Sequence, residues 1–140
     1  MTNQQKSSGA MHIILWIAQI ILAAGFLWAA AMKLFQPIEK LAAMWPWTGQ
    51  VSSLIVRLLG VIDLLGALGL ILPTLLRIRP GLTAITAVAI IVLMLCASVF
   101  HIVRGEAAVI GVNIFFALIA AFIAWGRLTE DRSERSSGVH

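Results

Sequence analysis

The stretch VRLLGVIDLLGALGLILP, residues 56–73, decides the fold, because it is apolar and long enough to cross a lipid bilayer. An α-helix rises about 1.5 Å per residue, so roughly 20 such residues span a hydrocarbon core of about 30 Å. Its charged residues are Arg57, near the start, and Asp63, well inside. The stretch predicts a transmembrane helix and raises the question of why that helix carries a carboxylate.

The whole chain has the same apolar character. Of its 140 residues, 61% are hydrophobic and 11% are charged, whereas soluble domains have roughly 45–50% apolar and about 25% charged residues. Long apolar runs occupy residues 13–32, 54–72, 82–103 and 107–125. No run shows the alternating polarity of barrel strands. We therefore expect an all-α fold, a four-helix transmembrane bundle over residues 12–127.

The first run has some features of a secretory signal peptide, since Lys6 precedes it and WAAAM closes it. It is longer than a typical signal core of about 7–15 residues, so we expect it to be retained as a helix. The flanking segments 1–11 and 128–140 are polar and contain few groups to bury. They are predicted to be disordered cytoplasmic tails.

The net charge of +4 does not indicate nucleic-acid binding, because the basic residues are scattered between the runs. With four spans, both termini and the middle loop share one face. That face collects more Lys and Arg than the other: Lys6, Arg77, Arg79, Arg127, Arg132 and Arg135. The positive-inside rule then predicts a multi-pass protein of the inner (cytoplasmic) membrane with both termini cytoplasmic. Cys96 is the only cysteine, which excludes an intrachain disulfide, and we expect it to be a small buried apolar residue.

The connection between the first two runs contains its own apolar pattern. Ile38, Leu41, Ala42 and Trp45 recur at helical spacing, which predicts a short helix lying in the membrane interface between helices 1 and 2. Trp45 and Trp47 are then either headgroup-depth anchors or a lid over a cavity between the helix ends.

The other two connections are short. PTLLRIRPG, bracketed by Pro73 and Pro80, predicts a tight hairpin between the second and third helices. HIVRGEA, residues 101–107, predicts another, with Glu106 in the first turn of the fourth helix.

Asp63 shares a helical stripe with small residues, the stripe being Val56, Gly60, Asp63, Ala67 and Leu70. Small residues mark close helix contacts in membranes, and ionisable groups there face the bundle interior with a partner. Similar stripes carry Gln19 and Lys33 on the first run, His101 on the third and Asn113 on the fourth. All except Gln19 fall in the half of the bundle away from the termini.

These positions predict a polar pocket with Asp63 at its floor and with Lys33 or His101 as its charge partner. Arg57 is a poorer partner, since six residues place it about 120° round the same helix. The predicted ligand-binding residues are Asp63, His101, Lys33, Asn113 and Arg57. Each residue also has a purely structural alternative. Asp63 and Asn113 could hydrogen-bond to each other and so join two helices. The side chains of His101, Lys33 and Arg57 could instead lie at the membrane interface. No metal site is expected, because His101 and His12 are the only histidines outside the C-terminus.

Four segments, taken in order, resemble the DoxX-like family of small four-helix membrane proteins. They are GFLWAAAMKLFQP, RLLGVIDLLGALGLILP, FHIVRGE and VNIFFALIAAFIAWGR. The resemblance covers about residues 12–127. It implies a link to thiosulfate:quinone oxidoreduction and to oxidative-stress complexes, with Asp63 where relatives often have Glu. The chain has no recognisable flavin, haem or iron–sulfur motif, so redox chemistry requires a quinone or a partner protein.

The leading hypothesis is a membrane protein that binds a quinone or another amphipathic molecule in this pocket. Membrane lipid and a partner oxidoreductase subunit are the implied partners. Three alternatives stay open: a small-solute or proton transporter acting as a homodimer, a lipid or sterol isomerase-like enzyme using His101 and Asp63, and a scaffold without a ligand.

Overall fold

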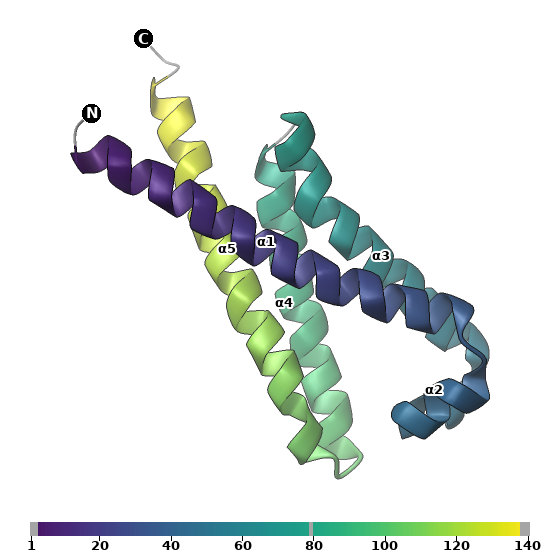
Figure 1. Cartoon of the computed structure of the whole chain (residues 1–140). Helices are drawn as coiled ribbons and strands as arrows, with labels where there is room; N and C mark the ends of the chain where they lie inside the picture. Colours follow the sequence, from purple (N-terminus) through teal and green to yellow (C-terminus); the bar gives the residue numbers. More distant parts are fainter. Residues whose placement is uncertain (1–2, 79, 138–140) are drawn as a thin grey trace.

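The computed structural model describes residues 3–78 and 80–137, and every regular element in these ranges is helical. The long helices are α1 (Asn3–Phe35), α3 (Ser53–Leu76), α4 (Pro80–Val103) and α5 (Ile110–Ser137). The connections hold the short helix α2 (Ile38–Met44) and the 3₁₀ turns η1 (Pro46–Gly49) and η2 (Ala107–Val109). Figure 1 shows both termini and the α3–α4 turn at one end, called the termini end, and α2 and the α4–α5 turn at the other, called the α2 end.

Four segments are long and apolar enough to cross a membrane: Gly9–Phe35, Ser53–Leu76, Gly81–Val103 and Ala107–Glu130. In lipid a backbone must satisfy its own hydrogen bonds, and a helix does so within each segment. The predicted all-α, four-helix membrane bundle is confirmed, and α2 lies where the sequence predicts a short helix between the first two spans.

The bundle is apolar outside and carries its polar residues inside. The buried residues of α3 are Val56, Gly60, Asp63, Ala67 and Leu70, which is the stripe predicted from the sequence. On α1, Gln19 is fully buried, whereas long apolar side chains such as Leu58, Val99 and Phe115 are exposed. This inverted arrangement suits a lipid surround, where exposed apolar side chains have no cost and polar side chains need partners.

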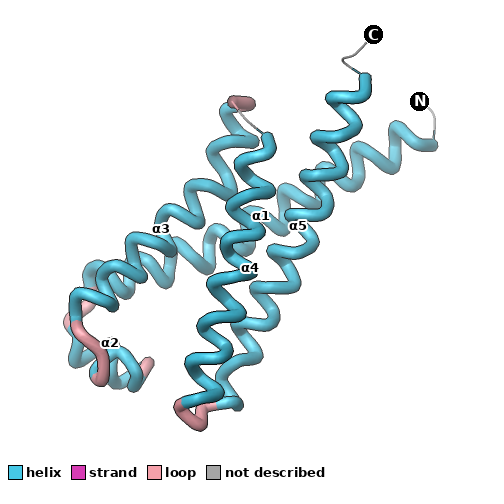
Figure 2. Tube along the Cα trace, turned by 180° about the vertical axis from the view of Figure 1, so that it is seen from behind, coloured by secondary structure: helices cyan, strands magenta, loops and turns pink. Residues whose placement is uncertain are grey.

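The helices pack as two closely matched pairs. α1 lies along α3 and α4 lies along α5, while α3 and α4 share less contact. Figure 2 shows why: α3 and α4 meet at their turn at the termini end and diverge towards the α2 end. The buried core joins the pairs through α1, where Leu22 and Phe26 pack with Ile90 and Ile123 of the other helices.

The helix ends differ from the predictions. α3 continues through Pro73 to Leu76 and ends at Arg77, which has a left-handed backbone (φ 55°). Proline removes only one helical N–H, and one turn of helix beyond it still closes its own hydrogen bonds.

The segments predicted as disordered tails also differ, because α1 begins at Asn3 and α5 runs to Ser137. Each of these terminal segments continues a helix that already spans the membrane, so it avoids the cost of nucleating a new helix. Residues 1–2 and 138–140 of those tails lie outside the described residues. The expectation that Cys96 is buried is wrong: it is exposed on the outer face of α4.

Candidate functional site

The centre of the candidate site is an ion pair between α1 and α3. Lys33, in the last turn of α1, places its Nζ 2.7 Å from Oδ2 of Asp63, and the two side chains are only 15% and 6% exposed. Of the two charge partners that the sequence allows for Asp63, the structure brings Lys33 to it. The ammonium group has three N–H donors, and the bond to Asp63 uses one of them.

Gly60 sets the approach of the two helices beside this pair. A Cβ atom at Gly60 would lie 2.9 Å from Cγ of Leu34 and 3.0 Å from Cβ of Lys33. The first distance is shorter than real Cβ atoms show and the second is at the tight limit, so any larger residue would force the two helices or their side chains to shift. The close contact lets a buried lysine reach a short aspartate side chain from the neighbouring helix.

Arg57 contacts the end of α1 rather than the carboxylate. Its Nη1 donates to the carbonyl oxygens of Lys33 at 2.6 Å and of Gln36 at 2.9 Å. The Lys33 carbonyl belongs to the last turn of α1 and the Gln36 carbonyl follows the helix end, where no further helical N–H is available. Arg57 therefore acts as a side-chain cap that holds the backbone of Lys33.

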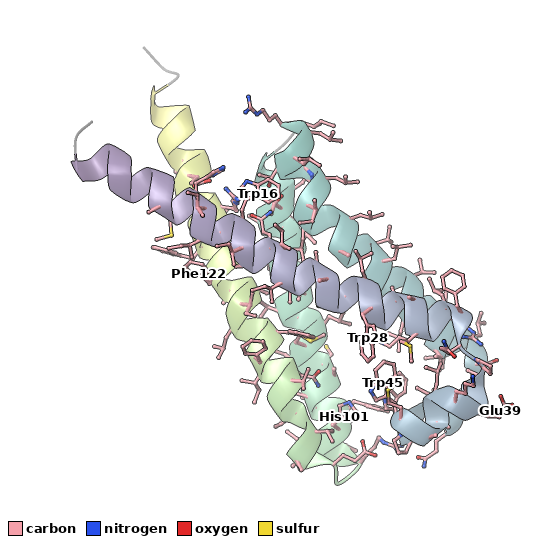
Figure 3. All side chains as sticks on the ribbon, viewed as in Figure 1. Trp16, Trp28, Glu39, Trp45, His101 and Phe122 are labelled. Carbon is pink, nitrogen blue, oxygen red and sulfur yellow. The ribbon has the colours of Figure 1, made fainter. Side chains whose placement is uncertain are left out.

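Trp45 and Trp47 form an aromatic wall beside the ammonium group. The Lys33 Nζ lies 5.8 Å from the Trp45 ring centre and 5.9 Å from the Trp47 ring centre, within cation–π range. Trp45 also packs edge-on against Trp28 of α1 at 5.6 Å, and Figure 3 shows these two side chains facing each other. Thr48, fully buried, donates to the Trp45 carbonyl oxygen at 2.7 Å and steadies the segment between α2 and α3.

His101 belongs to a second polar cluster at the α4–α5 turn. Its Nδ1 lies 2.8 Å from Oε2 of Glu106, whose other oxygen accepts two bonds from Arg104 at 3.0 and 3.1 Å. Glu106 occupies the N-cap position of η2, where its side chain makes no capping bond. The prediction that it lies in the first turn of the fourth helix is wrong, because α5 begins at Ile110. The hydrogen bonds from Arg104, followed by that from His101, lower the pKa of Glu106 below its usual value.

An aromatic bridge connects the two clusters. Trp47 packs edge-on against Phe100 of α4 at 6.0 Å, and Phe100 packs against the ring of His101 at 5.4 Å. Within the described residues, no hydrogen bond or ion pair joins Asp63 to His101. Asn113 is half-buried on α5 and makes no side-chain hydrogen bond to the described part of the chain. The predicted pocket residues are therefore divided between the ion pair, its cap, the turn cluster and Asn113.

An apolar groove of 290 Å³ lies between the helices, and its lining includes neither Lys33 nor Asp63. Its walls come from α1, α3 and α4 and include Phe26, Ile62, Gly66, Ile90 and Leu93. Ile62 and Gly66 flank Asp63 on α3, so the groove runs along the helix that carries the acid. Its one polar lining residue, Thr86, already donates to the Leu82 carbonyl oxygen at 2.8 Å. The groove suits a hydrocarbon chain or ring and offers it no free polar group.

Sequence reasoning overlooked a buried polar cluster at the termini end. Arg127 of α5 is 3% exposed and donates from Nε to Oε1 of Gln19 at 2.5 Å, while Gln19 donates to the Leu70 carbonyl oxygen at 2.6 Å. The signal was available, because Arg127 continues the stripe that contains Asn113 and because Gln19 lies on the buried stripe of α1. From the sequence, Arg127 is used only as one of the basic residues that set the membrane orientation, and so it is not assigned to a buried cluster.

A model of the DoxX-like family matches residues 17–123 of the chain. The chain belongs to the DoxX-like family. The match covers all four spans at least in part, together with Lys33, Arg57, Asp63, His101 and Asn113. Comparisons with curated proteins and with solved structures give no match. Among the described residues of this DoxX-like protein, no group of three or more His, Cys, Asp or Glu side chains is placed to hold a metal ion.

Proposed function

We propose that this DoxX-like membrane protein binds an amphipathic small molecule, with a quinone as the first candidate. The polar end of the ligand binds at Lys33 and Asp63, and its apolar part lies in the groove between α1, α3 and α4. Trp45 and Trp47 cover the polar end. In this proposal the protein works in the inner membrane, with both termini cytoplasmic, beside a partner oxidoreductase subunit in a redox or stress-defence system.

The observation that carries the proposal is the Lys33–Asp63 ion pair. Its ammonium lies 5.8 and 5.9 Å from two indole ring centres, and α3, which carries the acid, also lines an apolar groove. Lys33 keeps two N–H donors that Asp63 does not use, and a carbonyl or phenol oxygen accepts such donors. The indole faces suit a planar ring, and the groove suits its tail. Small-molecule sites commonly combine a few fixed polar groups with apolar walls in this way.

The long apolar barrier between the two ends of the bundle favours binding over transport. Between Gln19 and Lys33, α1 carries only apolar side chains, and this part of the helix is about 21 Å long. Leu22 and Phe26 close the core along this length. A solute or proton path would need polar groups or water there. An isomerase using Asp63 and His101 is disfavoured because Glu106 engages the imidazole, and in the described part of the chain no hydrogen bond or ion pair joins that ring to Asp63.

The test is a titration of the purified full chain in detergent with ubiquinone and with menaquinone, followed by quenching of tryptophan fluorescence. We expect saturable quenching of the wild type. Gly66→Leu, which fills the groove, should weaken binding at least about tenfold, the cost of displacing an apolar ring or chain from its site.

The matched control is Gly111→Leu, because nothing lies within 4 Å of a Cβ atom built at Gly111. It should bind as the wild type does. Asp63→Asn should weaken binding without closing the groove. If Gly66→Leu and Asp63→Asn both quench like the wild type, the ligand does not use this site and the proposal fails.

A further inference from the structure

The polar cluster at the termini end contains a buried donor group without an acceptor. Among the described residues, Nη2 of Arg127 is the one buried side-chain nitrogen or oxygen that has no hydrogen-bond partner. The other guanidinium nitrogens are occupied: Nε donates to Gln19, and Nη1 donates to Oε2 of Glu130 at 2.6 Å and to Nδ1 of His12 at 3.0 Å. An unpaired buried donor is costly, and it marks a place for an acceptor.

The surroundings of Arg127 hold its guanidinium in place, and the cluster reaches the surface through His12 and Glu130. The ring of Trp16 lies 5.8 Å from Cζ of Arg127 and flanks the guanidinium plane. The side chains of His12 and Glu130, by contrast, are 49% and 27% exposed, so an incoming group meets them first. Arginine presents paired N–H groups that match the oxygens of a phosphate better than a lysine does.

The depth of Arg127 suits the phosphate of a membrane lipid. The apolar span of α5 ends at Glu130, three residues after Arg127, which places the Arg127 backbone about 5 Å from the span's end along the helix axis. The next residue on α5, Leu128, lines an apolar groove of 170 Å³ together with Ala84, Ile85 and Val88 of α4. An apolar groove at this level offers room for part of an acyl chain.

We infer that Arg127 and its cluster form a binding site for an anionic phospholipid at the termini end. A phosphoryl oxygen accepts from Nη2, and an acyl chain lies in the groove beside Leu128. Arg77 and Arg132, both exposed at this end, add positive charge around the site. Glu130 opposes it, because its carboxylate lies on Nη1 and repels a second anion. This site is remote from Lys33 and does not depend on the ligand proposed there.

The test is lipid retention by native mass spectrometry, using the full chain with equal amounts of dioleoylphosphatidylglycerol and dioleoylphosphatidylcholine. We expect the wild type to retain phosphatidylglycerol preferentially. Arg127→Gln should lower that preference about tenfold, the change expected from one charge-assisted hydrogen bond. Glu130→Gln should raise it, because it removes the competing carboxylate. Arg77→Gln removes the same charge from the same end without touching the cluster, and should change the preference less than about twofold.

Several results overturn the inference. Equal losses in Arg77→Gln and Arg127→Gln mean that the lipid senses only the overall charge of the face. Equal retention of both lipids by the wild type means that there is no anion site. If millimolar inorganic phosphate displaces phosphatidylglycerol, the site takes free phosphate and not a lipid. Should Arg127→Gln fail to fold, Glu130→Gln decides the matter, and an unchanged preference in that variant contradicts the site.

Discussion

The Lys33–Asp63 ion pair allows a quantitative prediction, because the two partners are unequally buried. Asp63→Leu leaves the Lys33 ammonium without its carboxylate in a site where the lysine side chain is 15% exposed. Breaking a buried ion pair from one side costs roughly 3–5 kcal/mol. The flexible lysine stem allows the ammonium to move towards the headgroups, so we expect the lower value, about 3 kcal/mol.

The reverse change, Lys33→Met, leaves the carboxylate of Asp63, which is 6% exposed and has a short side chain. It has no comparable route to water, so the cost should be at least as large, about 3 kcal/mol or more. The double variant removes both charges and fills the space with apolar groups. It should cost no more than either single change, which corresponds to a coupling energy of about 3 kcal/mol.

The measurement is reversible unfolding in mixed micelles, in which the fraction of dodecyl sulfate is raised and helix content is followed by circular dichroism. Lys40→Met is the matched control, because Lys40 is exposed on α2, and it should change the unfolding free energy by less than about 0.5 kcal/mol. Additive single changes, with a double variant costing about 6 kcal/mol, would refute the reasoning, because uncoupled sites add. A ligand titration of the folded double variant then separates the site from the fold.

Two further predictions concern a helix contact and a turn. A Cβ atom at Gly69 would collide with the side chain of Thr86 on α4, so Gly69→Ala should destabilise the bundle by about 1–3 kcal/mol, and adding Thr86→Ala should restore most of that loss in the same unfolding assay. An unchanged stability in Gly69→Ala would contradict the close α3–α4 contact. For Glu106, hydrogen bonds from Arg104 and His101 lower the pKa in the folded state. The ionised carboxylate therefore stabilises the folded protein fully above the usual pKa of 4.5, and this stabilisation is lost as the pH falls through the folded pKa. The difference in thermal midpoint between wild type and Glu106→Gln should therefore be constant from pH 7 to about pH 5 and shrink at lower pH; a difference that grows on acidification has the wrong sign.

The buried stripes could be predicted from the sequence because the bilayer leaves few choices. Long apolar runs must be helical in lipid, and the polar residues on them must turn inward. The stripe through Gly60 and Asp63 follows from a period of 3.6 residues and from small neighbours, and the structure buries the same positions. The sequence also indicates that Arg57 is a poor partner for Asp63, because the angle between two residues on one helix is a local property.

The choice of partners between helices depended on the tertiary structure. Whether Asp63 pairs with Lys33 or with His101 depends on how closely α1 and α3 approach and how far α4 diverges, and no local pattern specifies either. Glu106 pairs with His101 and Arg104 because the turn before η2 folds the acid back on α4.

In the same way, Arg127 meets Gln19 from 108 positions along the chain, since α5 crosses α1 near the termini end. The sequence by itself determined that four apolar helices form and which face of each is buried, because lipid acts on every residue separately. Only the tertiary structure decided which buried charges meet, since that depends on the tilts and distances at which separate helices cross.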